Sequence, residues 1–139
     1  MTNDVQHLKL LTIFHYVMAG LTCLLSSFFL FHAFIGWSVM HGTGPFREAA
    51  KSAPPPGFGI MFFAVGVLAV CLGWLFGASI AYAGYSIAKR KHYLFCLIIA
   101  GLMCGLCNPI GTVLGVCTFV ILLRPSVKEI FQQDTVPTE

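Results

Sequence analysis

Charged side chains are scarce in this sequence of 139 residues, where Asp, Glu, Lys and Arg together make up 9%. A soluble domain carries about 25%, so this chain has too few charges to cover a surface that faces water. Hydrophobic residues make up 58%, and most of the surface must therefore face lipid. The length allows one compact bundle. We expect a single transmembrane domain over residues 1–131 and a disordered tail over residues 132–139.

Three long runs contain no Asp, Glu, Lys or Arg, namely residues 10–46, 52–88 and 92–123. A helix needs about 20 apolar residues to cross the ~30 Å hydrocarbon core of a bilayer, and each run is longer than that. The apolar stretch of the first run also exceeds the roughly 7–15 residues of a signal peptide, and no Ala-x-Ala cleavage site follows it. We therefore expect a retained membrane helix there.

The third run is too long for one helix, because its residues would extend about 48 Å. Asn108 and Pro109 stand at its midpoint. Asn is a preferred N-cap and Pro is favoured at the first helical position, so we expect two short helices joined by a tight turn. Whether this hairpin spans the membrane or is re-entrant stays open. The expected fold is an all-α, integral membrane four-helix bundle with helices at about 8–40, 58–88, 92–107 and 109–123.

A last segment, residues 124–131, is expected to lie along the inner membrane surface. Val127, Ile130 and Phe131 would share one apolar face of a short helix there.

The position of the basic residues predicts the orientation. The densest cluster is Lys89, Arg90 and Lys91, and positive clusters favour the cytoplasmic side. With four helices, both termini lie on that same side. Six of the eight basic residues are then cytoplasmic: Lys9, Lys89, Arg90, Lys91, Arg124 and Lys128. The topology anchors are Lys89, Arg90, Lys91 and Arg124.

Small residues recur at four-residue spacing on the expected helices. They are Gly73, Gly77 and Ala81 on the second helix, Gly101 and Gly105 on the third, and Gly111 and Gly115 on the fourth. In lipid, helices associate through close packing, and small residues mark the faces in contact. The stripes fit packing within one bundle, and they also fit docking onto another membrane subunit or a second copy.

Candidates for chemistry are few. No charged residue lies inside an expected span, which argues against proton-coupled transport but leaves a small passive pore open. A haem needs two histidines at matching depth on facing helices, and His15 and His92 are the weak candidates. We predict no metal and no cofactor, and no nucleic-acid partner.

Cys104 and Cys107 form a Cys-x-x-Cys pair beside the expected turn. Four-helix enzymes that pass electrons from protein thiols to quinone carry such a pair near the outer face. Those enzymes also need a second, exposed cysteine pair, and the outer loop 41–57 contains no cysteine. A turn with two small side chains is therefore favoured over a thiol–quinone redox site.

Three segments carry a resemblance: HLKLLTIFHY at residues 7–16, PIGTVLGV at 109–116 and LRPSVK at 123–128. With them the chain resembles a set of small, uncharacterised bacterial four-helix inner-membrane proteins. The resemblance implies a multi-pass protein of the bacterial inner membrane and no particular activity. The leading hypothesis is a non-catalytic accessory or scaffold subunit that packs against other membrane proteins or against itself, with the redox protein and the pore as alternatives.

Overall fold

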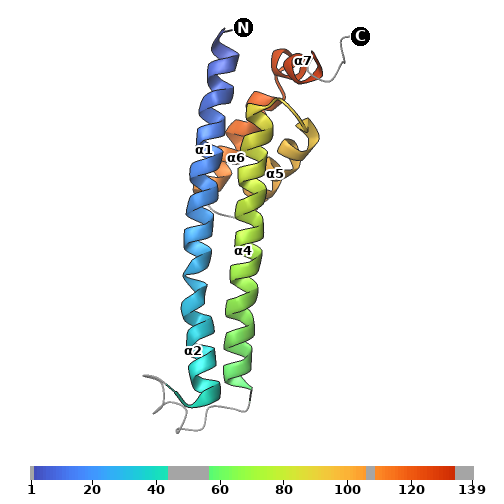
Figure 1. Ribbon diagram of the computed structural model, residues 1–139. Helices are drawn as coiled ribbons and strands as arrows, with labels where there is room; N and C mark the ends of the chain where they lie inside the picture. The colour runs from blue at the N-terminus through green and yellow to red at the C-terminus, as the bar shows by residue number, and fades with distance from the viewer. Residues whose placement is uncertain (1, 44–56, 106–108, 134–139) are drawn as a thin grey trace. The chain divides into compact units, whose positions relative to one another are not determined.

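The computed structural model describes residues 2–43, 57–105 and 109–133, and these residues are helical apart from short turns, with no strand among them (Figure 1). The all-α prediction is thus confirmed. The helices are α1 (Thr2–Ser27), α2 (Phe29–His41), α4 (Phe58–Ala88), α5 (Tyr93–Gly105), α6 (Pro109–Leu122) and α7 (Pro125–Gln133).

One expected helix, residues 8–40, is interrupted at a single residue, Phe28, which separates α1 from α2. Phe28 keeps right-handed helical angles, with φ −58° and ψ −29°, so the interruption is slight. Together the two helices give an apolar segment of 36 residues, Gln6–His41, and α4 gives another of 31 residues. Both are long and apolar enough to cross a membrane.

The ends of the long helices follow known stop signals. Gly42 takes a left-handed conformation (φ 57°) after α2, and its N–H donates to the carbonyl of Ser38, as expected for a helix that ends in a glycine. After α4, Arg90 takes the left-handed position (φ 55°), and the N–H of Lys91 donates to the carbonyl of Ser86 at 2.9 Å. A non-glycine residue in this conformation is uncommon, and here the hydrogen bond from Lys91 to Ser86 stabilises it.

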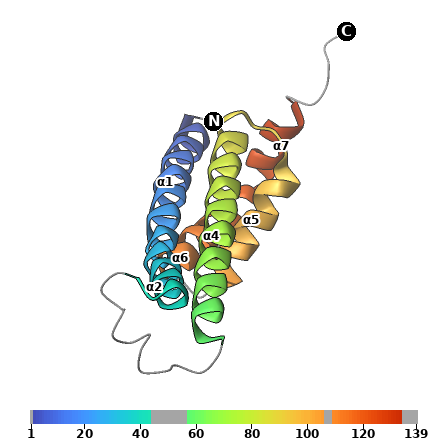
Figure 2. The same cartoon turned by 60° about the horizontal axis from the view of Figure 1, so that its bottom comes forward.

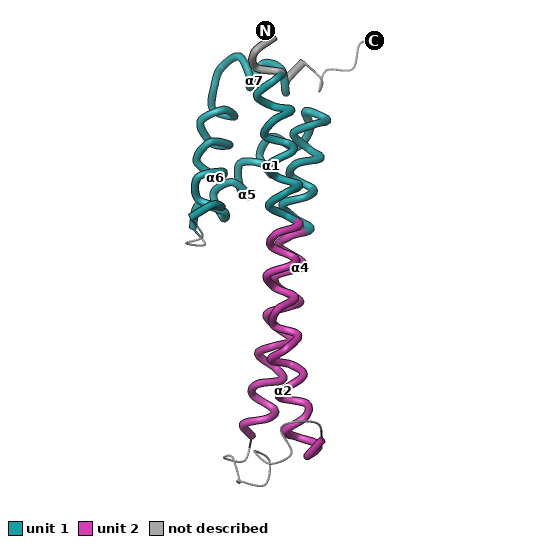
Figure 3. The backbone as a smooth tube through the Cα atoms, turned by 90° about the vertical axis from the view of Figure 1, so that its left-hand side faces the viewer, with its two compact units in different colours: residues 1–19, 78–139 teal, residues 20–77 magenta. Residues whose placement is uncertain are grey.

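The described chain divides into two compact units (Figure 3). Unit 1 comprises residues 1–19 and 78–139, and unit 2 comprises residues 20–77.

Unit 2 is a hairpin of two antiparallel helical segments with a seam of glycines on α4. A Cβ at Gly66 would lie 2.5 Å from the backbone nitrogen of Ala33, and a Cβ at Gly59 would lie 2.8 Å from Cγ of Met40. A Cβ at Gly73 would come closer still to its neighbour, the Cβ of Ser26. The three glycines are seven residues apart, and so are the three residues that they face, in the opposite direction. A seven-residue repeat keeps one seam facing a partner along the helix.

Unit 1 contains the start of α1, the end of α4 and the three shorter helices. α5 and α6 form an antiparallel hairpin, whose base is closed by the Tyr93 hydroxyl, which donates to the carbonyl of Leu122 at 3.1 Å. α5 lies beside the last turns of α4 (Figure 2), where Sγ of Cys96 donates to the carbonyl of Ala83 at 3.7 Å.

α7 follows α6 after a bend of 80°. Two of the three residues expected on its apolar face, Val127 and Phe131, are buried within unit 1, and the Phe131 ring meets Tyr93 edge to face at 5.7 Å between centroids. Ile130 is half-buried. Much of the face that the sequence suggested for the membrane surface is therefore covered by the protein itself.

The seam generates a prediction about Gly66. The Gly66→Ala variant should lose about 2 kcal/mol of unfolding free energy, because the added Cβ meets the backbone of α2 and forces the two helices apart. Unfolding in a mild detergent, followed by far-UV circular dichroism, measures the loss.

The matched control is Gly20→Ala, since a Cβ at Gly20 meets nothing within 4 Å. It should keep or slightly raise the stability, as alanine favours a helix interior over glycine. Equal effects of the two variants on the unfolding free energy would contradict the prediction that the glycine seam stabilises unit 2.

Candidate functional site

His15, one of the two weak candidates for a haem ligand, is fully buried in unit 1. Its Nδ1–H donates to the carbonyl of Leu11, one turn earlier on α1, at 2.9 Å. Gly84 of α4 makes room for it, since a Cβ there would lie 3.0 Å from Cβ of His15. The second ring nitrogen, Nε2, is buried and has no hydrogen-bond partner among the described residues.

His92 lies elsewhere in unit 1, at the turn between α4 and α5. It is exposed, its φ is 53°, and its ring lies 6.2 Å from that of Tyr82. His15 lies against Gly84 of α4, whereas His92 lies near Tyr82 of the same helix. Residues two apart on a helix point about 200° from each other. His15 and His92 are thus associated with opposite faces of α4, and the structure does not bring them together as a pair of haem ligands.

Cys104 lies near the tip of the α5–α6 hairpin, half-buried. Its thiol donates to the carbonyl of Thr112 at 3.9 Å, and the Thr112 hydroxyl donates to the carbonyl of Cys104 at 3.5 Å. A Cβ at Gly115 would lie 2.7 Å from Sγ of Cys104 and 2.7 Å from the carbonyl oxygen of Ala100. Cys104 therefore packs at the contact between α5 and α6. Its expected partner, Cys107, lies outside the described residues.

The predicted small-residue stripes divide into two groups. Gly73, Gly77, Gly111 and Gly115 are buried or in close contact, whereas Gly101 and Gly105 are exposed and Ala81 is intermediate. Among the described residues, a Cβ at Gly105 would meet nothing within 4 Å, and one at Gly101 would meet the Phe119 ring at 3.7 Å. Only the second group is left for contacts outside the chain.

Sequence reasoning missed three glycines that make close contacts in unit 2, which are Gly36, Gly59 and Gly66. The signal was present in the sequence as the seven-residue spacing of Gly59, Gly66 and Gly73. The four-residue spacing that is typical of close helix contacts in lipid does not connect these glycines.

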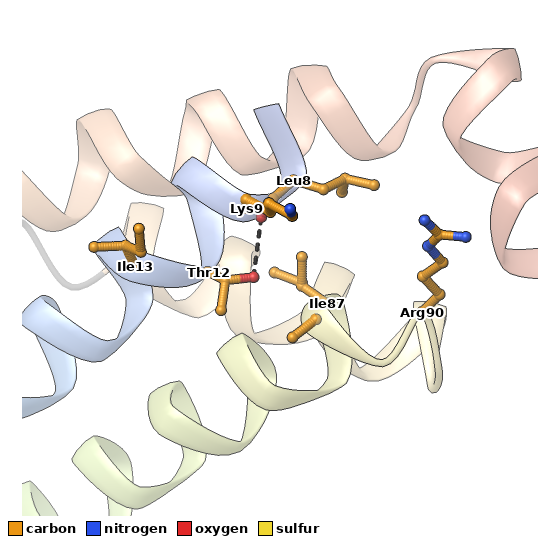
Figure 4. A pocket seen from close by; sticks show the side chains of 7 residues that line it. Leu8, Lys9, Thr12, Ile13, Ile87 and Arg90 are labelled. Carbon is orange, nitrogen blue, oxygen red and sulfur yellow. Dashed lines mark hydrogen bonds between the residues drawn. The ribbon is translucent and has the colours of Figure 1, made fainter. Parts of the chain in front are cut away.

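A pocket of about 380 Å³ opens in unit 1 between the start of α1 and the end of α4 (Figure 4). The described residues that line it are Leu8, Lys9, Thr12, Ile13, Ile87, Ala88 and Arg90. Four of these seven side chains are apolar. Of the four predicted topology anchors, Arg90 thus lines a pocket, while Lys89, Lys91 and Arg124 do not. No sequence pattern pointed to this pocket, because its two walls are about 75 residues apart in the chain.

Metal-ligating residues do not gather in the described part of the chain, where no group of three or more His, Cys, Asp or Glu side chains could hold an ion. Comparison with protein-family models, with curated proteins and with solved structures gives no match. We therefore infer a function from the contacts within the chain itself.

The environment of His15 generates a prediction. Because His15→Leu removes a buried nitrogen that has no partner and roughly keeps the side-chain volume, it should leave the unfolding free energy unchanged or raise it by about 1 kcal/mol. Thermal unfolding in detergent, together with the absorbance of bound haem, measures both possible roles.

His92→Leu, at an exposed position, is the control and should also be close to neutral. A loss of more than about 2 kcal/mol for His15→Leu alone, or haem absorbance that this variant abolishes, would show that His15 is a ligand or a required polar contact.

Proposed function

We propose that this chain is a multi-pass integral protein of the bacterial inner membrane, and that it acts as a non-catalytic accessory or scaffold subunit. Large apolar side chains are exposed along both long helices, among them Leu24 at 72%, Phe28 at 68% and Leu75 at 67%. Soluble monomers rarely expose contiguous apolar surface on this scale, and lipid is the environment that accommodates it.

The helix lengths support two full crossings and one partial one. The segment Gln6–His41 is about 54 Å long and α4 about 46 Å, whereas α5 and α6 are each about 20 Å long. Tyr93 and Leu122 close the base of the α5–α6 hairpin, so the chain enters and leaves this hairpin at the same end. We infer a re-entrant hairpin on the cytoplasmic side, where the basic turn Lys89–Lys91 would also lie.

The outer face of α5 carries the accessory-subunit proposal. It presents Leu94, Ile98, Gly101, Leu102 and Gly105, all exposed. Two glycines four apart on an apolar face allow another helix to approach closely in lipid. The space beside the glycines of the seam in unit 2 is already occupied by the chain's own helix. The space beside this pair is open to another helix. A helix of another membrane subunit, or of a second copy, would fit there.

The orientation can be tested with fusions. A green fluorescent protein at the C-terminus should fluoresce, and an alkaline phosphatase in the same place should be inactive, because that end is expected in the cytoplasm. Alkaline phosphatase fused after Thr43 should be active. The reverse pattern would contradict the proposed topology. So would the release of the fusion proteins from the membrane by alkaline extraction.

Assembly can be tested with Gly105→Leu. The Cβ of this leucine meets no neighbouring helix within 4 Å among the described residues, so the fold should persist, but a helix docked on α5 should be displaced. Native mass spectrometry of the complex extracted in mild detergent should show a mass above one chain for the wild type and at least about a tenfold lower assembled fraction for the variant.

Gly20→Leu is the matched control, since Gly20 is equally open but is followed four residues later by Leu24 instead of a small residue. It should assemble like the wild type. A wild type that is a single chain in gentle extracts would end the accessory-subunit proposal.

A further inference from the structure

The pocket between α1 and α4 combines an apolar wall with two cationic side chains. Leu8 and Ile87 are almost fully buried, at 5% and 1% exposure, and form its floor, while Ile13 and Ala88 are exposed at its side. Lys9 comes from α1, and Arg90 comes from the turn after α4, with Ile87 between them in the close view (Figure 4).

We propose that this pocket binds one anionic phospholipid, with its phosphate between Lys9 and Arg90 and the start of an acyl chain along the apolar wall. The inference rests on the proposed function only in that the chain lies in a membrane. It goes beyond that function because it assigns a ligand to the chain itself and needs no partner protein.

The charges favour an anion. Lysine ammonium and arginine guanidinium groups are the usual donors to phosphate, and the guanidinium can donate two parallel hydrogen bonds. Among the lining residues that the structure describes, none is an Asp or Glu that would oppose a negative headgroup. The Thr12 hydroxyl donates to the carbonyl of Leu8 at 2.9 Å, so its oxygen can still accept a hydrogen bond from a headgroup hydroxyl.

The backbone around Arg90 is fixed, which favours a site over a chance surface cluster. The left-handed turn is held by the N–H of Arg90, which donates to the carbonyl of Ile87 at 3.2 Å, and by the N–H of Lys91, which donates to the carbonyl of Ser86 at 2.9 Å. The base of the Arg90 side chain therefore keeps its place at the edge of the pocket.

The apolar wall distinguishes a lipid from a free anion. A soluble phosphate would gain nothing from Leu8, Ile13 or Ile87, whereas an acyl chain would bury their surface. The pocket lies at the charged ends of two long apolar helices, where basic residues meet lipid headgroups. Its volume of about 380 Å³ is within the usual range for small-molecule sites.

The test uses the full-length protein, purified in a mild neutral detergent and freed of lipid. Native mass spectrometry during titration should show one phosphatidylglycerol bound at least about tenfold more tightly than phosphatidylcholine with the same acyl chains. Inorganic phosphate at the same concentration should not displace it. Equal affinity for the two lipids would overturn the proposal, and complete displacement by phosphate would replace the lipid site with a simple anion site.

Three variants locate the site. The double variant Lys9→Gln with Arg90→Gln should lose the preference for phosphatidylglycerol. The control, Lys91→Gln with Lys128→Gln, removes the same charge from residues that do not line the pocket and should keep the preference. Ala88→Phe keeps both cations but fills the pocket, and it should weaken binding at least about tenfold.

An equal loss of the preference for phosphatidylglycerol in the two double variants would show attraction to net charge alone and would overturn the site. Unchanged lipid binding by the Ala88→Phe variant would also overturn it. Far-UV circular dichroism verifies that each variant is folded. If lipid binding fails while the protein still resists alkaline extraction and assembles, only the lipid site is wrong, and the proposed function stands.

Discussion

Two helical backbones can approach closely only where side chains are missing from the line of contact. In unit 2 the missing side chains are those of Gly59, Gly66 and Gly73 on α4, and the atoms that occupy the space belong to Met40, Ala33 and Ser26. In lipid this closeness matters more than in water, because burying apolar surface gives little advantage when the solvent is apolar as well. Dispersion contacts between the two backbones are then the main attraction that remains.

Several polar side chains bond within their own helix and so do not link one helix to another. The hydroxyls of Thr12, Ser27 and Thr118 donate to carbonyls one turn earlier, and so does the His15 ring. Such local bonds satisfy the donor at a low cost in a membrane. Other polar groups bond between helices, among them Trp74 to Ser27 in unit 2 and Tyr93 to Leu122 in unit 1. These bonds act together with the close fit at the glycines.

The sequence was informative about helices and poor about contacts. Runs without charge identified the apolar segments, and Pro109 placed the start of α6, because these signals are local. The burial of His15 could not be predicted, since it depends on Gly84, 69 residues later. The same holds for the pocket, whose walls meet only when α1 and α4 run side by side within unit 1. The four-residue spacing rule marked Gly115, which lies against Ala100 and Cys104, but it did not mark Gly59 and Gly66 of the seam that repeats every seven residues.

The seven-residue repeat also limits how this chain can change in length. Inserting one residue into α4 between Gly59 and Gly73 would rotate every following position by about 100° and turn the later glycines away from the residues that they face. An insertion between the two helices would leave every pairing intact. Homologues of this protein should therefore differ in length between residues 43 and 57, and they should keep α2 and the first half of α4 at constant length.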